Sequence, residues 1–301
     1  MHPVTGSARL RKPEYDHAAA TEGEDLTGLS DVMRVTAEEA GAILMEGFGL
    51  PHTLEGKEGR EFLTEADLRS QEHIRTRLEG ACPGAVFVGE EGACVAIPDG
   101  SPFWLVDPLD GTANYAHGFP FFSVSIAFSD GRSIVAGCVH DPVRRETFTA
   151  GRGEGAFLFG GVCADCGDAG PAGSPERIEV SGARTLDESI LATGFPYRRS
   201  PGDLGFDVRP LLHHLGRVRG IRRTGSAALD LCYVACGRLD GYWEEHLRPW
   251  DMAAGALAVE EAGGRILGWD RMPWSTRSGG IIAAAPGIMQ AVLDGIVHPV
   301  N

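Results

Sequence analysis

The sequence predicts a mixed α/β fold, α+β in its first half, on three observations. Apolar residues recur at helical spacing in some stretches and form short β-branched runs in others, so both helices and strands are expected. Glycine is abundant, with 42 among 301 residues, and it divides the chain into many short elements. After residue 181 the pattern changes to strands alternating with helices, which favours an α/β arrangement.

These patterns divide the chain into three segments. Residues 1–28 are polar and without periodicity, which predicts a flexible tail. Residues 29–185 form an α+β half in which helices precede a mainly antiparallel sheet. Residues 186–301 form an α/β half, and no flexible linker separates the two halves.

The α+β half should contain two helices and then strands. The first helix is predicted from Ser30 to residue 49, with a buried stripe at spacings of three and four. The second starts at Thr64, where Thr-x-x-Asp has the form of a capping box. The stripe of the first helix is Met33, Ala37, Ala40, Ile43, Leu44 and Phe48, and that of the second is Ile74, Leu78 and Ala81. Strands are expected at 85–88, 103–106, 121–129, 133–142 and 146–161.

The α/β half should alternate more regularly. A helix over 225–239 has Ser226 at its N-cap, and a helix over 249–264 begins at a proline and ends at two glycines. The other expected elements are strands at 189–195, 240–245 and 279–285 and helices at 206–216 and 286–296.

The charge of the chain limits its partners. A formal net charge of −15 disfavours nucleic acid, and it should also repel a phosphate ester unless cations neutralise the site. The chain contains no run of about 18 apolar residues, so no membrane span is expected. The N-terminus lacks the apolar segment of a secretory signal. Seven cysteines without a disulfide-type spacing indicate a reduced, cytoplasmic protein.

Acidic residues stand where predicted elements begin or end. Glu90 follows strand 85–88, Asp107 and Asp110 follow strand 103–106, and Asp251 opens a helix. Strand ends in such folds meet at one edge of a sheet, so we expect these carboxylates to gather there. Together they would repel one another unless cations lay among them, and oxygen ligands suit Mg²⁺, Mn²⁺ or Ca²⁺ rather than Zn²⁺.

Gly111 and Thr112 follow Asp110 directly. If a helix begins at Thr112, its free N–H groups would favour a phosphate, and glycine lets the backbone approach it. Metal ligands and a helix N-terminus on one loop are typical of phosphoryl transfer. An isolated Asp-Pro or Gly-Thr pair is more often an ordinary turn, so the prediction depends on their joint occurrence.

Longer segments resemble the inositol monophosphatase family. VDPLDGTANYAHGFPFFSVSIA resembles the family's first signature, and RPWDMAAGALAVEEAGGRI resembles the second. The resemblance covers about residues 30–300. It implies a layered αβαβα sandwich of the inositol monophosphatase and fructose-1,6-bisphosphatase (sugar phosphatase) type, and a homodimer. The matching segments are 62–91, 106–127, 193–197, 222–245 and 248–266.

The resemblance also implies two to three Mg²⁺ ions in each site, with Mn²⁺ as a substitute. Glu90, Asp107 and the carbonyl of Leu109 would hold the first ion. Asp107, Asp110 and Asp251 would hold the second, and a third, weaker ion would rely on Glu90 and waters.

Catalytic roles follow from the same resemblance. Thr112, backed by Asp67, would orient the attacking water, with Glu90 as the third catalytic residue, and no covalent intermediate would form. The backbone N–H groups of Gly111 and Thr112 would bind the phosphate. The residues expected to contact the substrate are Asp110, Ala227, Glu244 and Asp251.

Inositol 1-phosphate is the expected substrate, a small phosphorylated polyol. Relatives suggest histidinol phosphate, fructose 1,6-bisphosphate, adenosine 3′,5′-bisphosphate or NADP as alternatives. A non-catalytic regulatory protein that binds metal and phosphate is an alternative of another class. The resemblance also implies inhibition by lithium.

Two features depart from the family or match it poorly. Residues 161–176 are an insertion rich in Gly, Pro and Ala, and are expected to form an exposed loop; Cys163 and Cys166 within it provide only half of a zinc site. Lys57 lies near the place where many members carry a basic residue beside the third metal.

Overall fold

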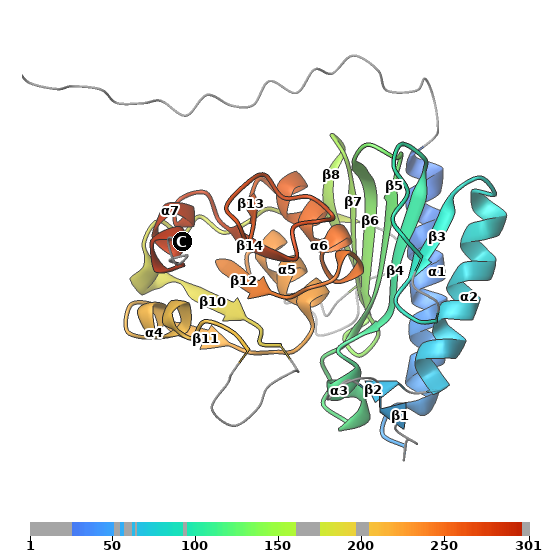
Figure 1. The fold of residues 1–301 in the computed structure, drawn as a ribbon, viewed down its shortest axis with the longest axis horizontal. Coiled ribbons are helices and arrows are strands. Elements are labelled where there is room, and N and C mark those ends of the chain that lie inside the picture. Colours follow the sequence, from blue (N-terminus) through green and yellow to red (C-terminus); the bar gives the residue numbers. More distant parts are fainter. Residues whose placement is uncertain are drawn as a thin grey trace, which may run out of the picture.

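The computed structural model describes residues 26–50, 55–56, 62–63, 65–92, 95–160, 175–196 and 205–296. Within these residues the elements form five layers (Figure 1). Helices α1 and α2 cover one face of a seven-stranded sheet, α5 and α6 lie between it and a five-stranded sheet, and α4 and α7 cover the far side. This confirms the layered αβαβα sandwich that the resemblance implies.

The larger sheet has the strand order β3-β4-β5-β6-β7-β8-β9. Only the β3–β4 pair is parallel, and its other pairs are antiparallel. Both faces are covered by helices, so β5 and β7 are buried at every residue, including the serines and threonines that alternate with their apolar residues. Their bounds are β3 Val86–Gly89, β4 Phe103–Asp110, β5 Ser123–Ser129, β6 Ile134–Asp141, β7 Glu146–Gly151, β8 Gly155–Gly160 and β9 Glu176–Arg177.

The outer helices are α1 (Leu26–Gly47) and α2 (Glu65–Ala81), and a small pair of strands, β1 (Glu55–Gly56) and β2 (Phe62–Leu63), lies between them in the chain. The stripe of α1 is confirmed at Met33, Ala37, Ala40 and Leu44, which are fully buried, whereas Ile43 is half-buried and Phe48 lies just beyond the end of the helix. The predicted start at Ser30 is wrong: the helix begins at Leu26 and so includes residues 26–28 of the expected tail. Ala81 is also wrong as a buried position, because it is exposed at the end of α2.

Strand β4 continues beyond the predicted 103–106 segment. It includes Asp107 and Asp110, although its register with β5 shifts between them. Pro108 has no N–H to donate to the ladder, which accounts for an irregularity at this point. The strand therefore carries the acidic residues on a bulged end rather than on a separate loop.

The smaller sheet has the order β11-β10-β12-β14-β13, with β11, β10 and β12 parallel. Its edge strands β11 and β13 were not predicted, because three or four residues of mixed polarity give little periodic signal. Helices α4 (Arg209–Leu215) and α7 (Met289–Gly295) match predicted helices and cover its outer face. The strands are β10 Ile190–Thr193, β11 Gly220–Arg222, β12 Gly241–Glu245, β13 Arg265–Gly268 and β14 Gly280–Ala284, and a 3₁₀ turn, η1, spans Leu186–Glu188.

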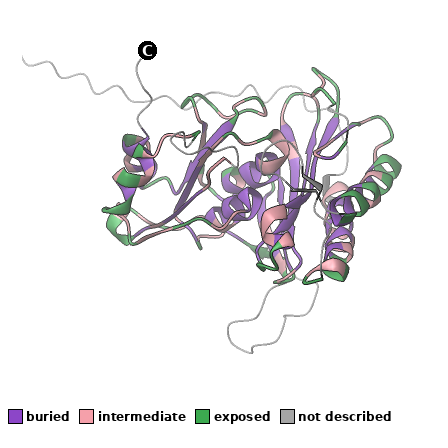
Figure 2. Ribbon diagram, turned by 60° about the horizontal axis from the view of Figure 1, so that its bottom comes forward, coloured by how far each residue is buried: buried purple, intermediate pink, exposed green. Residues whose placement is uncertain are grey.

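The central helices are α5 (Ala227–Ala235) and α6 (Pro249–Glu261). Both are buried almost throughout, as Figure 2 shows, because each lies between two sheets and needs no polar face. Ser226 caps α5, as predicted, and accepts a hydrogen bond from the N–H of Leu229. Small residues allow close packing: a Cβ on Gly137 of β6 would lie 3.0 Å from Ala254 of α6.

Some predicted features lie outside the described residues. They are residues 1–25 of the tail, Lys57, the N-cap Thr64, and residues 161–174 of the insertion with Cys163 and Cys166. The insertion reaches the sheet again at Glu176, which begins β9.

The packing of α1 on the larger sheet gives a first test. A Cβ on Gly41 would overlap the imidazole of His140, whereas a Cβ on Gly80 of α2 would have nothing within 4 Å. Gly41→Ala should lower the free energy of unfolding by about 1–3 kcal/mol. Gly80→Ala should be neutral or slightly stabilising, because alanine is the better helix former. Urea unfolding of both variants measures this, and equal stabilities would contradict the packing described.

Candidate active site

The bulged end of β4 and the turn after it form the centre of the site. Asp107 is buried, and its Oδ1 accepts the N–H of Leu109 at 2.9 Å. Gly111 has a φ of 93°, and a Cβ there would lie 3.1 Å from the carbonyl oxygen of Phe121. Helix α3 (Thr112–Ala116) then begins at Thr112, as the phosphate prediction requires.

Asp110 joins the two halves of the chain. Its Oδ2 accepts the hydroxyl of Ser226 at 2.6 Å and the N–H of Ala228 at 2.8 Å. These donors lie at the N-terminus of α5, where the helix dipole favours a negative charge. Asp110 is therefore held by a helix from the other half, more than a hundred residues further along the chain.

Glu90 and Asp251 approach the same region from two other elements. The N–H of Glu90 donates to the carbonyl of Val106 at 3.0 Å, which places Glu90 beside the end of β4. Asp251 lies in the first turn of α6, where its Oδ2 accepts the N–H of Arg248 at 2.8 Å. Ser125 of β5 donates to the carbonyl of Trp250 at 3.1 Å and so fixes that turn against the sheet.

Burial and the neighbouring acidic residues raise the pKa values of three aspartates in this region, Asp107, Asp110 and Asp251. Burial, followed by the charges of Glu90, Asp110 and Asp251, raises the pKa of Asp107 well above its usual value. Burial and the charge of Glu90 likewise raise the pKa of Asp251. Burial raises the pKa of Asp110 to about 6, although the hydrogen bonds from Ser226 and Ala228 oppose the rise. The structure thus gathers the four acidic residues into one region, as the sequence predicts.

The oxygen atoms of these four carboxylates are suitable ligands for a hard cation. Carboxylate and carbonyl oxygens are the ligands that Mg²⁺ and Mn²⁺ prefer, and Asp107, Asp110 and Asp251 would regain their charged forms beside a cation. Among the described residues no three acidic, histidine or cysteine side chains close around one point. Asp110 and Asp251 turn instead toward backbone and hydroxyl donors. The residues therefore match the ligand preference of Mg²⁺ and Mn²⁺, and the carboxylates would have to rotate toward a bound ion.

Thr112 and Asp67 form a pair beside this group. The hydroxyl of Thr112 lies 3.3 Å from Oδ1 of Asp67 and 3.0 Å from the carbonyl oxygen of Leu109. The hydroxyl can donate its single proton to only one of these acceptors at a time. The lone pairs of its oxygen can accept a hydrogen bond from a donor such as water. Asp67 is fully buried on α2, which Ser70 ties to the turn by a 3.0 Å bond to the carbonyl of Pro108.

The expected substrate contacts lie on α5 and β12. Ala227 is the first residue of α5, next to the donors that hold Asp110. Glu244 accepts a hydrogen bond from the hydroxyl of Tyr242. Burial raises the pKa of Glu244 to about 7, and the charge of Asp110 contributes to this rise, so Glu244 belongs to the same electrostatic group.

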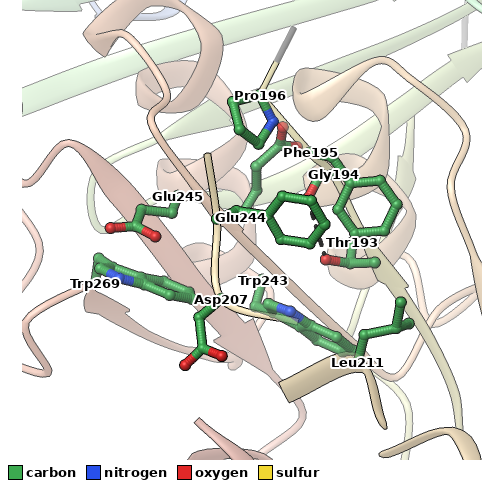
Figure 3. Close-up of a pocket in the computed structure, with 11 residues that line it drawn as sticks. Thr193, Gly194, Phe195, Pro196, Asp207, Leu211, Trp243, Glu244, Glu245 and Trp269 are labelled. Carbon is green, nitrogen blue, oxygen red and sulfur yellow. Dashed lines mark hydrogen bonds between the residues drawn. The ribbon is translucent and has the colours of Figure 1, made fainter. Parts of the chain in front are cut away.

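A pocket opens beside Glu244 (Figure 3). It holds about 310 Å³ of empty space, part of it open to solvent, and aromatic rings form much of its wall. Phe195 and Phe206 stack with ring centroids 4.7 Å apart. The pocket adjoins Glu244 rather than the four acidic residues, so it extends the candidate site on the side of β12.

Sequence reasoning missed several residues that hold the site together. Gln71 accepts the N–H of Glu91 and donates to its carbonyl, at 2.9 and 2.8 Å, so it clamps the turn that carries Glu90. Asn114 donates to the carbonyls of Phe121 and Thr224, at 2.7 and 2.8 Å. These bonds join residues far apart in the chain, and no periodicity or motif spacing signals them.

Comparisons with known proteins show which family the chain resembles. The sequence profile of the inositol monophosphatase family matches residues 25–299. The chain is 37% identical to the inositol-1-monophosphatase of Rhizobium meliloti over 276 residues, 91% of this chain and 98% of that protein. It is 39% identical to the Nus factor SuhB of Pseudomonas aeruginosa over 243 residues, 80% of this chain and 84% of that protein.

Solved structures give the same result. The suhB extragenic suppressor protein of Bartonella henselae aligns with a TM-score of 0.79 at 37% identity, covering 91% of this chain and 100% of that one. An IMPase of Thermotoga maritima aligns with a TM-score of 0.75 at 30% identity, covering 88% and 95%. In the part of the chain that the structure describes, no helix is long and apolar enough to cross a membrane.

The raised pKa of Asp110 predicts a dependence of stability on pH. In metal-free protein the folded state holds this proton up to about pH 6, whereas an unfolded aspartate loses it near pH 3.8. Stability should therefore fall as the pH rises through that window. Asp110→Asn keeps the acceptor for Ser226 and Ala228, so between pH 4 and 7 wild type should lose about 2–3 kcal/mol more than this variant.

Unfolding in urea with a chelator present, at several pH values, measures the difference. The exposed Asp294 supplies a matched control, and Asp294→Asn should follow wild type. Parallel curves for wild type and Asp110→Asn would show that Asp110 is not strained by its neighbours.

Proposed function

The chain belongs to the inositol monophosphatase family and is a phosphoric monoester hydrolase, and from this premise we propose that it hydrolyses inositol 1-phosphate with Mg²⁺ as cofactor. One observation carries the proposal: Glu90, Asp107, Asp110 and Asp251 repel one another at the start of α3. Such a cluster suits a divalent cation, and the cation suits a phosphate.

The assignment of ligands follows the resemblance. Glu90, Asp107 and the Leu109 carbonyl would hold one ion, and Asp107, Asp110 and Asp251 a second. When bound, Mg²⁺ supplies a water of lowered pKa and neutralises charge on the phosphate. Two to three ions are expected, and Mn²⁺ can replace Mg²⁺.

The residues of the chain position the reactants. Thr112 accepts a hydrogen bond from the attacking water while its own proton goes to Asp67, so the pair fixes the direction of attack. Glu90 lies on the facing turn as the third catalytic residue. The N–H groups of Gly111 and Thr112 bind the phosphate, and the left-handed φ of Gly111 aims the start of α3. No side chain forms a covalent bond to phosphorus.

The alcohol part of the substrate contacts the residues on α5 and β12 together with Asp110 and Asp251. Glu244 is a hydrogen-bond acceptor for substrate hydroxyls, Ala227 leaves room beside it, and Asp110 and Asp251 complete the contacts. A polyol such as inositol offers the most hydroxyls to these acceptors. Histidinol phosphate, fructose 1,6-bisphosphate, adenosine 3′,5′-bisphosphate and NADP are alternative substrates for the same chemistry.

A second candidate function is regulatory, and some relatives of the chain, such as that of Pseudomonas aeruginosa, are named Nus factor. It is a non-catalytic role in which metal and phosphate binding serve regulation. The presence of the whole set favours the enzyme: Glu90, Asp107, Asp110, Thr112, Asp251 and Asp67. The resemblance supports a homodimer. The cysteine content favours the cytoplasm, and the change of sequence pattern after residue 181 favours a division of the chain near residue 185.

The proposal is tested by phosphate release from a panel of esters with and without Mg²⁺. Inositol 1-phosphate should lead histidinol phosphate, fructose 1,6-bisphosphate and adenosine 3′,5′-bisphosphate by about tenfold in kcat/KM, which is about 1.4 kcal/mol. Another leading ester would refute the substrate and keep the metal mechanism. No release despite Mg²⁺ binding would support the regulatory role.

Asp107→Asn tests the metal assignment. It removes a charge from the cluster but keeps the acceptor for the N–H of Leu109. We expect kcat to fall by roughly two orders of magnitude or more while the unfolding transition is retained. Asp294→Asn is the control, and turnover that survives in Asp107→Asn would show that Asp107 holds no essential ion.

A further inference from the structure

Glu244 is held in place by its own strand. Tyr242 and Glu244 are two residues apart on β12, so their side chains lie on the same face. Tyr242 is fully buried and packs in the core against α5 and α6. Its hydroxyl donates to Oε2 of Glu244, and its ring cannot move without disturbing that core. The donor is therefore a fixed point for the carboxylate.

The neighbouring strand limits Glu244 from the side. Strand β10 runs parallel to β12, with Thr193 paired to Trp243, so Gly194 lies next to Glu244 (Figure 3). A Cβ built on Gly194 would overlap both carboxylate oxygens of Glu244. The φ of Gly194 is outside the left-handed region, so the backbone itself does not require glycine. Glycine is needed here for space.

The remaining surroundings favour the same position. Arg223, which donates to the carbonyl of Phe195, attracts the carboxylate of Glu244, while Asp110 repels it. Glu244 thus accepts a hydrogen bond from Tyr242 and lies in a space that only a glycine at position 194 leaves open. Across the site, Asp110 repels it.

We propose that Tyr242 and Gly194 are positioning residues that fix the carboxylate of Glu244 and so set the preference for phosphate esters of polyols over simple phosphate esters. The inference rests on the proposed function, in which Glu244 accepts hydroxyls of the alcohol. A hydrogen bond to a charged acceptor discriminates strongly only when the acceptor is already oriented, because orienting it otherwise costs part of the binding energy. Tyr242 and Gly194 provide that orientation without touching the substrate.

The test compares two esters in each variant. The quantity is kcat/KM for inositol 1-phosphate divided by kcat/KM for 4-nitrophenyl phosphate, with Mg²⁺ present. Tyr242→Phe removes the donor and keeps the ring, and Gly194→Ala places a methyl group where the carboxylate lies. Each should lower the ratio by roughly tenfold, mainly through a higher KM for inositol 1-phosphate.

Two matched controls separate positioning from damage to the fold. Tyr233→Phe removes a hydroxyl from a ring that packs on Phe121 instead of lying beside Glu244. Gly182→Ala adds a methyl group where nothing lies within 4 Å. Both should keep the wild-type ratio. In a Glu244→Ala background, neither Tyr242→Phe nor Gly194→Ala should lower the ratio further, since the group that they position is gone.

The outcomes are distinguishable. A fall in the ratio that disappears in the Glu244→Ala background supports the inference. Equal losses on both esters, or losses that add to that of Glu244→Ala, overturn it while the proposed function stands. A wild-type enzyme that does not prefer inositol 1-phosphate to 4-nitrophenyl phosphate contradicts the proposed substrate, and the inference with it. If Gly194→Ala fails to fold, Tyr242→Phe alone decides, because it changes no packing volume.

Discussion

The crowding of four acidic residues, buried Asp107 and Asp110 with half-buried Asp251 and Glu90, is the constraint on which the arrangement of the site depends. Each of the three aspartates has a raised pKa, first because it is buried and then because other acidic residues surround it. A folded protein keeps such a group only if something offsets the repulsion. Hydrogen bonds from Leu109, Ser226, Ala228 and Arg248 do so in part, and a divalent cation would do the rest.

The layered fold serves this constraint because it brings four separate elements to one place. The ends of β3 and β4, the start of α5 and the start of α6 each contribute donors or acids. The two sheets do not pair with each other, so the site depends on side-chain bonds such as Ser226 to Asp110 and Asn114 to Thr224. A change in how the halves pack would therefore alter the acidic group directly.

The sequence predicted the fold class and the gathering of the four acidic residues, because both follow from local patterns. Asp107, Asp110 and Asp251 stand at ends of strongly apolar segments, and Ser226 has an ordinary N-cap signal. The second role of Ser226, as a donor to Asp110, depends on contact across 116 residues and leaves no local trace. The same holds for Gln71 and for Gly194, whose place beside Glu244 follows only from the β10–β12 register. The early start of α1 and strand β13 were missed because short or polar segments carry weak periodicity.

Proton release on metal binding tests the central claim most directly. Calorimetric titration of Mg²⁺ into metal-free protein in buffers of different ionisation enthalpy gives the number of protons released per ion. If the cluster holds protons because its acids repel one another, binding should release protons near pH 6, where Asp110 is partly protonated, and more of them than at pH 8. Binding without proton release at either pH, or no binding at all, would contradict the claim that these carboxylates form the cation site.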